Sequence, residues 1–563
     1  MATNHDPEIA IASSLLRPEL HPRWALSPWH LAIVPFWCAL YYLVNLFPLR
    51  ETDLWGHVAY GNWILEHGAL PLEDPFVSLM QGMKVIDAAW LSQVIYALVE
   101  RVRGGEGLSG LFALTTLATY LLIGRTFYLQ SRNLVVTHLA VVLVFLLGWS
   151  RVSTMRPENF GVLCFAILLW LTAEVAPSGS AAASAQVGRR NSRLRLWIGV
   201  PLLMVAWSNL HGSFVCGLLM LACFLGGAVI EVACRTRSPG QVLADPEVCR
   251  WLLLFELAVA ATLVNPYGMD LLLNTLWFAK NENLHEITEW QPMAILEAGG
   301  REFAVSVVLM LFVFRHGRWR VPVAHVLLLA VFGASVLRGI RMIWWYAALV
   351  GLAVTPQLAD IWERGRPLWS RKPVAHVSRR GWFGLPRERS WSYSWVALLL
   401  MGMTFAVSPS GRSLLTHSSR VPEELYTAST PWKLTEFLRG HPPQGQVMNP
   451  QWWGDWLLWD GPADIQLFMT TNLHLAPRQV WKDYRVVRET RSGWQNVLGR
   501  YCVQTVVLDK ALQTTLLRYL RASGEWRIVY EDAIGMIFQN VRGDAMVRRK
   551  KAEPVPNIDD KSW

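Results

Sequence analysis

The stretch Glu51-Thr52-Asp53-Leu54-Trp55-Gly56-His57 directly follows the first long apolar run of the chain, residues 28–48, and opens a long loop that is rich in acids. The apolar run contains no Asp, Glu, Lys or Arg and is long enough to cross a bilayer. A carboxylate directly after such a span can face both water and lipid headgroups. The stretch therefore predicts a membrane protein whose acidic residues gather at a membrane surface.

The composition of the whole chain indicates the same class. Of the 563 residues, 53% are hydrophobic and only 17% are charged, and the apolar residues occur in blocks too long for the helices of a soluble protein. The net charge of +10 first suggests a nucleic-acid partner. The arginines, however, gather in short loops between apolar blocks, which is the pattern that orients a membrane protein. We therefore expect membrane lipids as the surroundings and no nucleic-acid partner.

The apolar blocks predict a polytopic α-helical membrane protein with about eleven transmembrane helices. The segments are 28–48, 107–124, 133–149, 158–176, 196–210, 213–234, 250–264, 303–315, 321–338, 341–357 and 393–408. The first helix is expected to stay in the membrane, because residues 1–27 carry acids where a cleavable signal peptide is basic. The amphipathic piece 88–103 is expected to lie along the membrane surface without crossing it.

The basic residues predict the orientation of these helices. With residues 1–27 as a cytoplasmic N-terminal segment, the arginine-rich loops, above all residues 358–392, fall on one side of the membrane. The membrane domain is then residues 28–408, and its outer side carries loop 50–106. We expect a bacterial inner membrane, because the chain carries no organelle address, and an outer side that faces the periplasm.

The C-terminal part of the chain, residues 409–542, is predicted to be a soluble extracytoplasmic α/β domain. Strand-like segments at 446–448, 465–469, 503–508, 526–530 and 535–538 alternate with helix-like segments. We find no GxGxxG, P-loop or Ser/His/Asp arrangement there, so a binding or packing role is expected. The basic and proline-containing tail, residues 543–563, is predicted to be disordered.

Candidate catalytic residues lie in the outer loop. Asp53 comes just beyond the first span, where a carboxylate can act as a general base. His57 follows one helical turn later, and Asp74 follows in the turn-like stretch Leu70–Pro75, so several titratable groups can converge. The alternative for an isolated aspartate at a membrane boundary is a helix-end carboxylate with no chemical task.

Arginines on the outer side run against the positive-inside pattern and suggest phosphate binding. Arg156, Arg338 and Arg341 lie at the outer ends of helical hairpins, and a planar guanidinium suits bidentate capture of a phosphate. The alternative is snorkelling or, for Arg151 and Arg156, an ion pair with Glu158.

Three further residues are candidates for contact with a substrate. His211 marks a broken helix at the outer side, although a buried, hydrogen-bonded histidine is the commoner arrangement. Glu289 and Trp290 suit a hydroxyl-rich ligand such as a sugar, and the alternative is an ordinary interfacial tryptophan. The seven cysteines lack metal-type spacing, and no HExxH or EF-hand pattern occurs. No cofactor or metal site is predicted, and a divalent metal stays open.

Residues 28–130 resemble the GT-C superfamily of membrane glycosyltransferases, specifically the branch of protein O-mannosyltransferases and lipid A aminoarabinose transferases. In that branch an aspartate opens the first outer loop, a glycine-, tryptophan- and proline-containing pattern follows, and an amphipathic segment precedes the second span. Here Asp53, the stretch Gly61–Pro71 and Trp90-Leu91 follow that order. The resemblance implies that Asp53 is the catalytic carboxylate. Leu54 stands where many members have a second acid, and Asp87-Ala88 stands where they have a lysine that contacts the donor phosphate.

These observations lead to one main hypothesis and two rivals. The main hypothesis is an inverting glycosyltransferase, in which Asp53 deprotonates an acceptor hydroxyl that attacks a sugar linked to polyprenyl phosphate. Outward arginines would stabilise the departing phosphate, and the acceptor is a lipid, a glycan or a protein. The first rival is a catalytically inactive GT-C-like scaffold or complex subunit with a partner-binding C-terminal domain. The second is a transporter, for which buried paired charges between internal repeats are expected.

Overall fold

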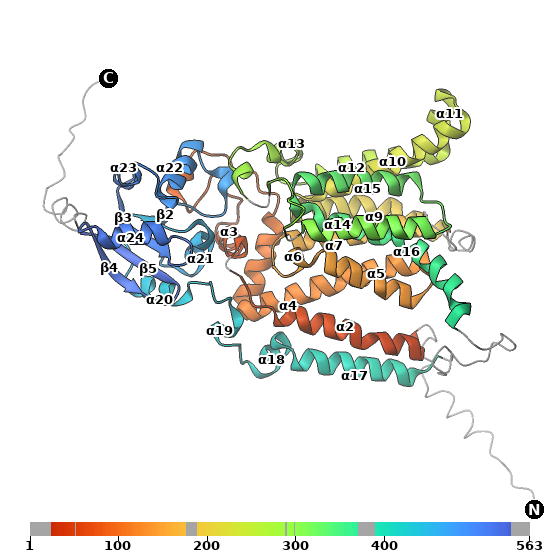
Figure 1. The fold of residues 1–563 in the computed structure, drawn as a ribbon, viewed down its shortest axis with the longest axis horizontal. Coiled ribbons are helices and arrows are strands. Elements are labelled where there is room, and N and C mark those ends of the chain that lie inside the picture. The colour runs from red at the N-terminus through yellow and green to blue at the C-terminus, as the bar shows by residue number, and fades with distance from the viewer. Residues whose placement is uncertain are drawn as a thin grey trace, which may run out of the picture. The chain divides into compact units, whose positions relative to one another are not determined.

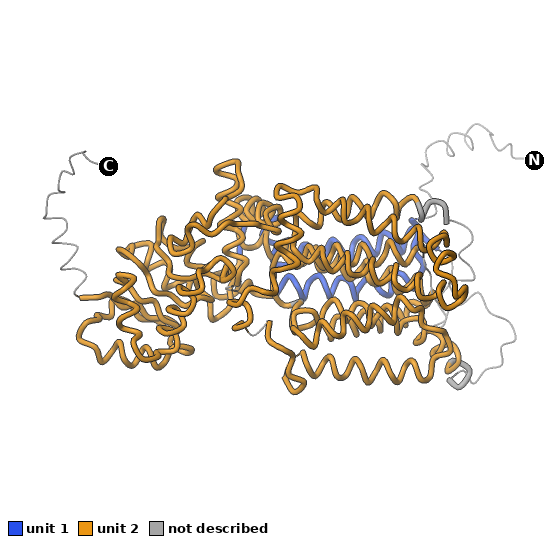
Figure 2. The backbone as a smooth tube through the Cα atoms, turned by 90° about the horizontal axis from the view of Figure 1, so that it is seen from above, with its two compact units in different colours: residues 1–46, 366–419 blue, residues 47–365, 420–563 orange. Residues whose placement is uncertain are grey.

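The computed structural model describes residues 24–50, 52–175, 189–287, 290–297, 299–369 and 389–541. The predicted tail 543–563, most of the N-terminal segment 1–27, much of the basic loop 358–392 and Glu289 lie outside these ranges. The chain divides into two compact units, which Figure 2 shows in different colours. Unit 1 contains residues 1–46 and 366–419, and unit 2 contains residues 47–365 and 420–563.

Unit 1 is built around α2 (Pro28–Leu46) and α17 (Trp391–Val407), which pack against each other. The short helix α18 (Pro409–Thr416) follows α17 after a bend of 79°. Its proline occupies the first helical turn, where the missing N–H costs nothing. The side chain of Asn45, near the end of α2, donates to the Ser410 hydroxyl at 2.7 Å. This bond ties the end of the first apolar helix to the start of α18.

Unit 2 contains a bundle of long helices that run side by side (Figure 1). They are α4 (Trp90–Ser131), α5 (Leu134–Leu147), α7 (Glu158–Val175), α9 (Arg189–Leu210), α10 (Phe214–Thr236), α12 (Pro246–Thr262), α14 (Gly300–His316), α15 (Val323–Arg338) and α16 (Ile343–Trp369). Helix α4 packs against α5 and α7, and α10 packs against α12 and α15. Apolar side chains such as Leu114, Leu139, Leu253 and Leu311 stay exposed on this bundle, as expected for a surface that faces lipid.

The bundle confirms the multi-span membrane class, but it does not confirm the predicted count of eleven spans. Four described helices are long and apolar enough to cross a membrane, and the bent pair of α17 and α18 makes up to five. Three further apolar helices, over 134–147, 194–210 and 323–338, are shorter. At a rise of 1.5 Å per residue, a helix of 14 residues covers about 21 Å, which is less than a hydrocarbon core of about 30 Å.

Helix α4 joins two segments that the sequence analysis treats separately. The predicted surface piece 88–103 and the predicted span 107–124 form one 42-residue element, interrupted at Gly104 by non-helical angles of φ 57° and ψ −154°. The first part of α4 lies against α3 (Asp53–His67), and its later part lies in the bundle. The kink therefore separates the part of α4 near Asp53 from the membrane-spanning part.

The C-terminal part of unit 2 forms a five-stranded sheet in the order β2-β1-β3-β5-β4. The strands are β1 (Gln446–Met448), β2 (Gln466–Leu467), β3 (Val503–Asp509), β4 (Trp526–Glu531) and β5 (Gly535–Asn540). Strand β1 is parallel to β2 and β3, whereas β5 is antiparallel to β3 and β4. All five predicted strands are confirmed, with β2 shorter than expected.

Helices surround this sheet and complete the C-terminal part. They are α20 (Trp432–Gly440), α21 (Gln451–Asp460), α22 (Arg478–Arg488), α23 (Trp494–Arg500) and α24 (Thr514–Ala522). Central strand β3 alternates between two apolar clusters: Val506 and Leu508 contribute to one cluster, and Val507 contributes to the other. This alternation is the period of a strand that is buried on both faces.

Helix α3 is held between α4 and α21, and two glycines allow the close approach. A Cβ atom at Gly56 would lie 2.8 Å from Cγ and Oδ2 of Asp455 in α21. A Cβ atom at Gly61 would collide with the backbone carbonyl of Gln93 in α4. At Gly61 only glycine fits, and at Gly56 a methyl group would displace the Asp455 carboxylate. The helix that begins with Asp53 is thereby positioned by the first part of α4 on one side and by α21 of the C-terminal part of unit 2 on the other.

Candidate functional site

Asp53 is the first residue of α3, and Thr52 caps this helix by accepting a hydrogen bond from the Leu54 N–H. An acid in the first turn is favoured because the N-terminal end of a helix carries partial positive charge. The Asp53 carboxylate forms an ion pair with Arg156, with 3.2 Å between Oδ1 and Nε. Both side chains are partly exposed. The structure therefore brings together a predicted catalytic residue and a predicted phosphate-binding residue.

The segment before Asp53 is fixed by the C-terminal part of unit 2. The Leu49 N–H donates to the Leu425 carbonyl at 2.8 Å, and the Thr427 N–H donates back to the Leu49 carbonyl at 3.1 Å. The indole of Trp55 donates to the Arg50 carbonyl at 2.9 Å and stacks on Trp459 with ring centroids 4.1 Å apart. These contacts hold Arg50 and Asp53 in place from both sides of the helix start.

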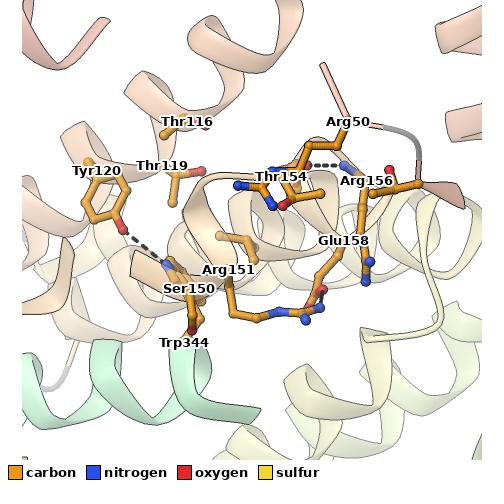
Figure 3. A pocket seen from close by; sticks show the side chains of 13 residues that line it. Arg50, Thr116, Thr119, Tyr120, Ser150, Arg151, Thr154, Arg156, Glu158 and Trp344 are labelled. Carbon is orange, nitrogen blue, oxygen red and sulfur yellow. Dashed lines mark hydrogen bonds and ion pairs between the residues drawn. The ribbon is translucent and has the colours of Figure 1, made fainter. Parts of the chain in front are cut away.

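A cavity of about 260 Å³ adjoins the Asp53 and Arg156 pair (Figure 3). Its lining combines three guanidinium groups with a ring of hydroxyls. The lining residues are Arg50, Thr52, Thr116, Thr119, Tyr120, Ser150, Arg151, Thr154, Arg156, Glu158, Asn159, Val162 and Trp344. Figure 3 shows Thr116, Thr119 and Tyr120 on one side of the cavity and Arg156 and Glu158 on the other. We call the cavity that these residues line the site cavity.

The groups at the site cavity hold one another in position. Arg151 forms a close ion pair with Glu158, and both side chains are largely buried. The Arg156 backbone N–H donates to Asn159 Oδ1 at 2.6 Å, and the Trp344 indole donates to the Tyr120 hydroxyl at 3.3 Å. The ion pair with Glu158 that the sequence analysis offers as an alternative is thus realised by Arg151. Arg156 instead pairs with Asp53.

His57 lies one turn beyond Asp53 on α3, within hydrogen-bond distance of Gln93, with 3.1 Å between Nδ1 and Nε2. Burial lowers the pKa of His57, although nearby Asp53 and Asp87 act to raise it. Burial raises the pKa of Asp87, against the effect of His57 and of the hydrogen bond from the Ala89 N–H. His57 is therefore a neutral imidazole at pH 7, next to a carboxyl group that sequence reasoning had not singled out.

Asp74 is buried near α3, and hydrogen bonds engage both of its carboxylate oxygens. Oδ2 accepts from the Tyr60 hydroxyl at 2.7 Å, and Oδ1 accepts from the backbone N–H groups of Phe76 and Val77 at 2.9 Å each. Burial raises the pKa of Tyr60, and the charge of Asp74 raises it further. This pattern is typical of a carboxylate that shapes a loop.

His211 lies at the break between α9 and α10, as the sequence analysis predicts for a broken helix. Its Nδ1 accepts from the Ser213 N–H at 3.1 Å and lies 2.8 Å from the Ser213 hydroxyl, which also accepts from the Trp207 indole. Burial lowers the pKa of His211 to about 4. Because Nδ1 accepts a backbone hydrogen bond, the ring proton of the neutral imidazole lies on Nε2.

The remaining predicted residues differ in how they are placed. Arg341, in the 3-10 helix η6 (Ile340–Met342), lies over the ring of Trp290, with 4.3 Å between the guanidinium carbon and the ring centroid. Arg341 is also close enough to influence Glu158 and His211 electrostatically. Arg338, at the end of α15, is exposed. Glu289 lies outside the described residues.

Sequence reasoning missed two residues of the C-terminal part that lie near α3. Asp455 in α21 accepts hydrogen bonds from the backbone N–H of Thr471, at 3.1 Å, and from its hydroxyl. Burial raises the pKa of Asp455 to about 7, and nearby Asp53 and Asp74 add to the increase. Burial likewise lowers the pKa of His474 to about 4, with a contribution from His57. The only sequence signal for Asp455 is an acid within the aromatic stretch Trp452–Trp459.

Within the described ranges, no three His, Cys, Asp or Glu side chains come together in an arrangement that could hold a metal ion. The positive charge at the site cavity is instead supplied by arginines. Asp53 is paired with one of them, Arg156.

The sequence matches no protein-family model and no curated protein. The structure is similar to that of the archaeal oligosaccharyltransferase AglB from Archaeoglobus fulgidus in complex with an inhibitory peptide and a dolichol-phosphate. That similarity has a TM-score of 0.50 at 12% sequence identity and covers 90% of this chain and 74% of the other. The chain therefore shares the fold of this archaeal oligosaccharyltransferase. The apo form of an Archaeoglobus fulgidus oligosaccharyltransferase also matches, with a TM-score of 0.49 at 13% identity, over 85% of this chain and 69% of the other.

The similarity extends well beyond the segment on which the sequence resemblance rests. The sequence resemblance covers residues 28–130, whereas the structural match covers nine-tenths of the chain. The predicted GT-C resemblance is therefore confirmed at the level of the fold. At 12% identity the match carries no residue roles.

Proposed function

We propose that this protein is an inverting glycosyltransferase that moves a sugar from a polyprenyl-phosphate donor to an acceptor hydroxyl, with Asp53 as general base. The observation that carries the proposal is the position of Arg156. Its side chain pairs with Asp53 and also lines a cavity rich in guanidinium and hydroxyl groups. A base and an anion site that share one arginine are what such a transfer needs.

The chemistry of the site cavity favours a sugar phosphate as its ligand. Arg50, Arg151 and Arg156 provide planar, permanently charged donors for phosphate oxygens. The hydroxyls of Thr116, Thr119 and other residues lining the cavity provide partners for sugar hydroxyls. Of the three arginines predicted from sequence, Arg156 belongs to this set. We assign Arg341 a role through Glu158 and Trp290, and we assign the exposed Arg338 no contact with the donor.

In the proposed reaction Asp53 accepts the proton of the acceptor hydroxyl as its oxygen forms a bond to the anomeric carbon. The bond between that carbon and the phosphate oxygen breaks, and its electron pair leaves with the polyprenyl phosphate. A phosphate monoester is a stable leaving group, so no general acid is needed. Preorganised arginines stabilise the charge that develops on the departing oxygen, and one such contact contributes about 3 kcal/mol.

The other predicted residues are given supporting roles in this proposal. His57, neutral at pH 7, lies beside Asp53 and orients the base. Asp74 shapes the loop next to α3 through its three hydrogen bonds. The Nε2–H of His211 and the ring of Trp290 are proposed to contact the substrate. The fold match to a protein solved with a peptide and a dolichol-phosphate supports a lipid-linked donor and a separate acceptor.

We propose further that the protein lies in a bacterial inner membrane with Asp53 on the periplasmic side. This assignment is supported by the asymmetry of the arginine-rich loops along the chain. A periplasmic site would meet both a lipid-linked donor in the membrane and an acceptor in the aqueous compartment.

A catalytically inactive scaffold is the second candidate, and one observation favours it. The carboxylate oxygen Oδ1 of Asp53 is already engaged by Arg156, and Leu54, which replaces an acid of the resembling family, is buried. In this case the ion pair between Asp53 and Arg156 would be a structural contact, and the protein would bind a sugar phosphate in the site cavity without transferring the sugar.

Sugar release from radiolabelled polyprenyl-phosphate sugars by purified protein in lipid nanodiscs distinguishes the two candidates. We expect turnover by the wild type, its loss in Asp53→Asn, and donor binding by both. Asp464→Asn is a matched control, because Asp464 is exposed, has a positive φ that asparagine tolerates, and lies in the C-terminal part. Donor binding without turnover in the wild type, across the panel of sugars and acceptors, would favour the scaffold.

A further inference from the structure

Helix α13 (Met269–Trp277) has an apolar face that no described residue of unit 2 covers. Met269, Leu273, Leu276 and Trp277 are between 45% and 57% exposed, whereas Leu271 and Leu272 are buried. The exposed positions follow the spacing i, i+4, i+7 and i+8, so they form one stripe along the helix. The helix is therefore apolar both on its inward face and on this outward stripe.

The surroundings of α13 match an interface between water and lipid. Asp270, at the edge of the stripe, forms an ion pair with Lys84 at 2.7 Å. Lys280 lies over the Trp277 ring at 3.6 Å from its centroid. Tryptophan and lysine side chains with an apolar body and a polar tip are typical of the headgroup level of a membrane.

The place of α13 in the chain favours lipid over a protein partner. The helix follows α12 after a short turn, and α12 packs along α10, which is long and apolar enough to span a membrane. Leu252, Leu253 and Leu257 of α12 are themselves exposed, so the apolar surface of the bundle continues toward α13. At 1.5 Å per residue, nine residues cover about 14 Å, which is too short to cross the bilayer.

We propose that α13 is an in-plane membrane anchor, whose exposed stripe lies in the boundary between headgroups and acyl chains beside the site. Figure 1 shows α13 at the end of the helical bundle that faces the C-terminal part of unit 2. Burial of an apolar stripe about 5–10 Å into the interface is the usual depth for such a helix. The exposed side chains of α13 would thus contact membrane lipid and not another protein.

The anchor is directly connected to residues near the site. Phe278 follows Trp277, and its ring contacts both Trp290, at 5.7 Å between centroids, and His474, at 5.1 Å. The Asn281 side chain donates to the His474 carbonyl at 3.1 Å. Trp290 in turn supports Arg341. A membrane-bound α13 therefore holds these aromatic residues at a fixed depth relative to the bilayer.

Spin-label accessibility in phospholipid vesicles tests the proposal without reference to any enzymatic activity. Nitroxides are placed at Leu273→Cys and Leu276→Cys, with Leu512→Cys in the C-terminal part as the water-exposed control. The accessible native cysteines Cys38, Cys234, Cys249 and Cys502 are first replaced by serine. Collisions with oxygen and with a nickel chelate report the depth of each label.

We expect the two α13 labels to be rich in oxygen collisions and poor in nickel collisions, at a depth of about 5–10 Å, and the control label to show the reverse. Nickel accessibility at Leu273 and Leu276 equal to that at Leu512 would overturn the proposal. Both α13 positions are exposed, so the labels should not disturb packing. Brominated-lipid quenching of a bimane at Leu276→Cys is the second measurement, and an absence of quenching would also count against the anchor.

Discussion

Asp53 and Arg156 meet at 3.2 Å, although one begins α3 and the other lies in the short connection before α7. Neither element alone explains the contact: α3 is positioned by Gly56 and Gly61 against its neighbours, and Arg156 is held by the hydrogen bond of its N–H to Asn159. The pair lies at the border of the cationic cavity. Its energetic coupling is therefore the most direct test of the proposed chemistry.

Arg156→Gln is expected to lower the rate of sugar release about 100-fold, because one preorganised donor at a developing charge contributes about 3 kcal/mol. Arg156→Lys keeps the charge and loses the planar fork, so it should be intermediate. Rates are measured for both variants and for Arg315→Gln, an exposed arginine at the far end of α14. Because Asp53→Asn removes turnover, the coupling is read from donor binding: the change in donor affinity caused by Arg156→Gln should differ between the Asp53→Asn background and the wild type. Strict additivity would argue that the two residues do not act together.

Arg151 and Glu158 should reveal the cost of an unpaired charge near the cavity. Both side chains are largely buried, with exposed fractions of 14% and 12%. Arg151→Met leaves the Glu158 carboxylate without its partner, and breaking a buried pair costs about 3–5 kcal/mol. Thermal unfolding in nanodiscs should show a lower midpoint for Arg151→Met. The double variant Arg151→Met and Glu158→Gln should recover most of the loss, and a double variant no more stable than the single one would contradict this explanation.

Asp455 should make the stability of the protein depend on pH. Burial raises its pKa to about 7, above the value near 3.9 of an unfolded chain. The folded state then binds the proton more tightly, so the free energy of unfolding falls as the pH rises from about 4 to about 7. The thermal midpoint of the wild type should therefore fall, relative to that of Asp455→Asn, as the pH rises over this range.

Thr471→Val is the control for the Asp455 prediction. The Thr471 hydroxyl donates to Asp455 and lowers the pKa of that carboxyl group. Without this hydroxyl the pKa should rise further, and the pH-dependent loss of stability should extend to higher pH. A pH profile identical in the wild type, Asp455→Asn and Thr471→Val would show that Asp455 does not titrate in this range.

Features that depend on a few neighbouring residues could be predicted from the sequence. Features that depend on contacts between distant parts of the chain could not. The strands β1 to β5 were found because alternating apolar residues and turn residues are read over a few positions. The predicted count of eleven spans is not confirmed, because apolarity alone does not report helix length: α5 has 14 residues between its two caps. The non-helical angles at Gly104 separate the predicted surface piece 88–103 from the next span within α4, as the sequence predicts.

The candidate site shows the same division. Asp53 was found from its place after an apolar run, and Arg156 from its charge on an unexpected side. Asp455 was missed because its relation to Asp53 is created only by the packing of α21 on α3, far apart in the chain. The hydrogen bond from the Tyr60 hydroxyl to Asp74 could not be predicted either, since it requires the loop that contains Asp74 to fold back onto α3.

Glu106 and Arg420 should stabilise unit 2 through a buried ion pair. Arg420 binds Glu106 through Nε at 2.8 Å and Nη2 at 3.0 Å, and the Glu106 side chain is only 2% exposed. Arg420→Met is expected to lower the free energy of unfolding by about 3–5 kcal/mol. The matched control is Lys433→Met, which breaks an exposed pair with Glu423 at 3.9 Å and should cost less than about 1 kcal/mol. Equal losses in denaturant unfolding would contradict the difference in burial.

The glycines of α3 provide a test of how tightly the site is built. Gly61→Ala would drive a methyl group into the backbone carbonyl of Gln93, which cannot move without shifting α4. Gly56→Ala would press on the Asp455 carboxylate at 2.8 Å, which is the end of a side chain, so its cost in stability should be smaller. Gly499→Ala in α23 meets open space and should stabilise the helix by about 1 kcal/mol. Thermal midpoints should therefore fall in the order Gly499→Ala, wild type, Gly56→Ala, Gly61→Ala. If Gly61→Ala were as stable as the wild type, the close packing of α3 on α4, and with it the fixed position of Asp53, would have to be abandoned.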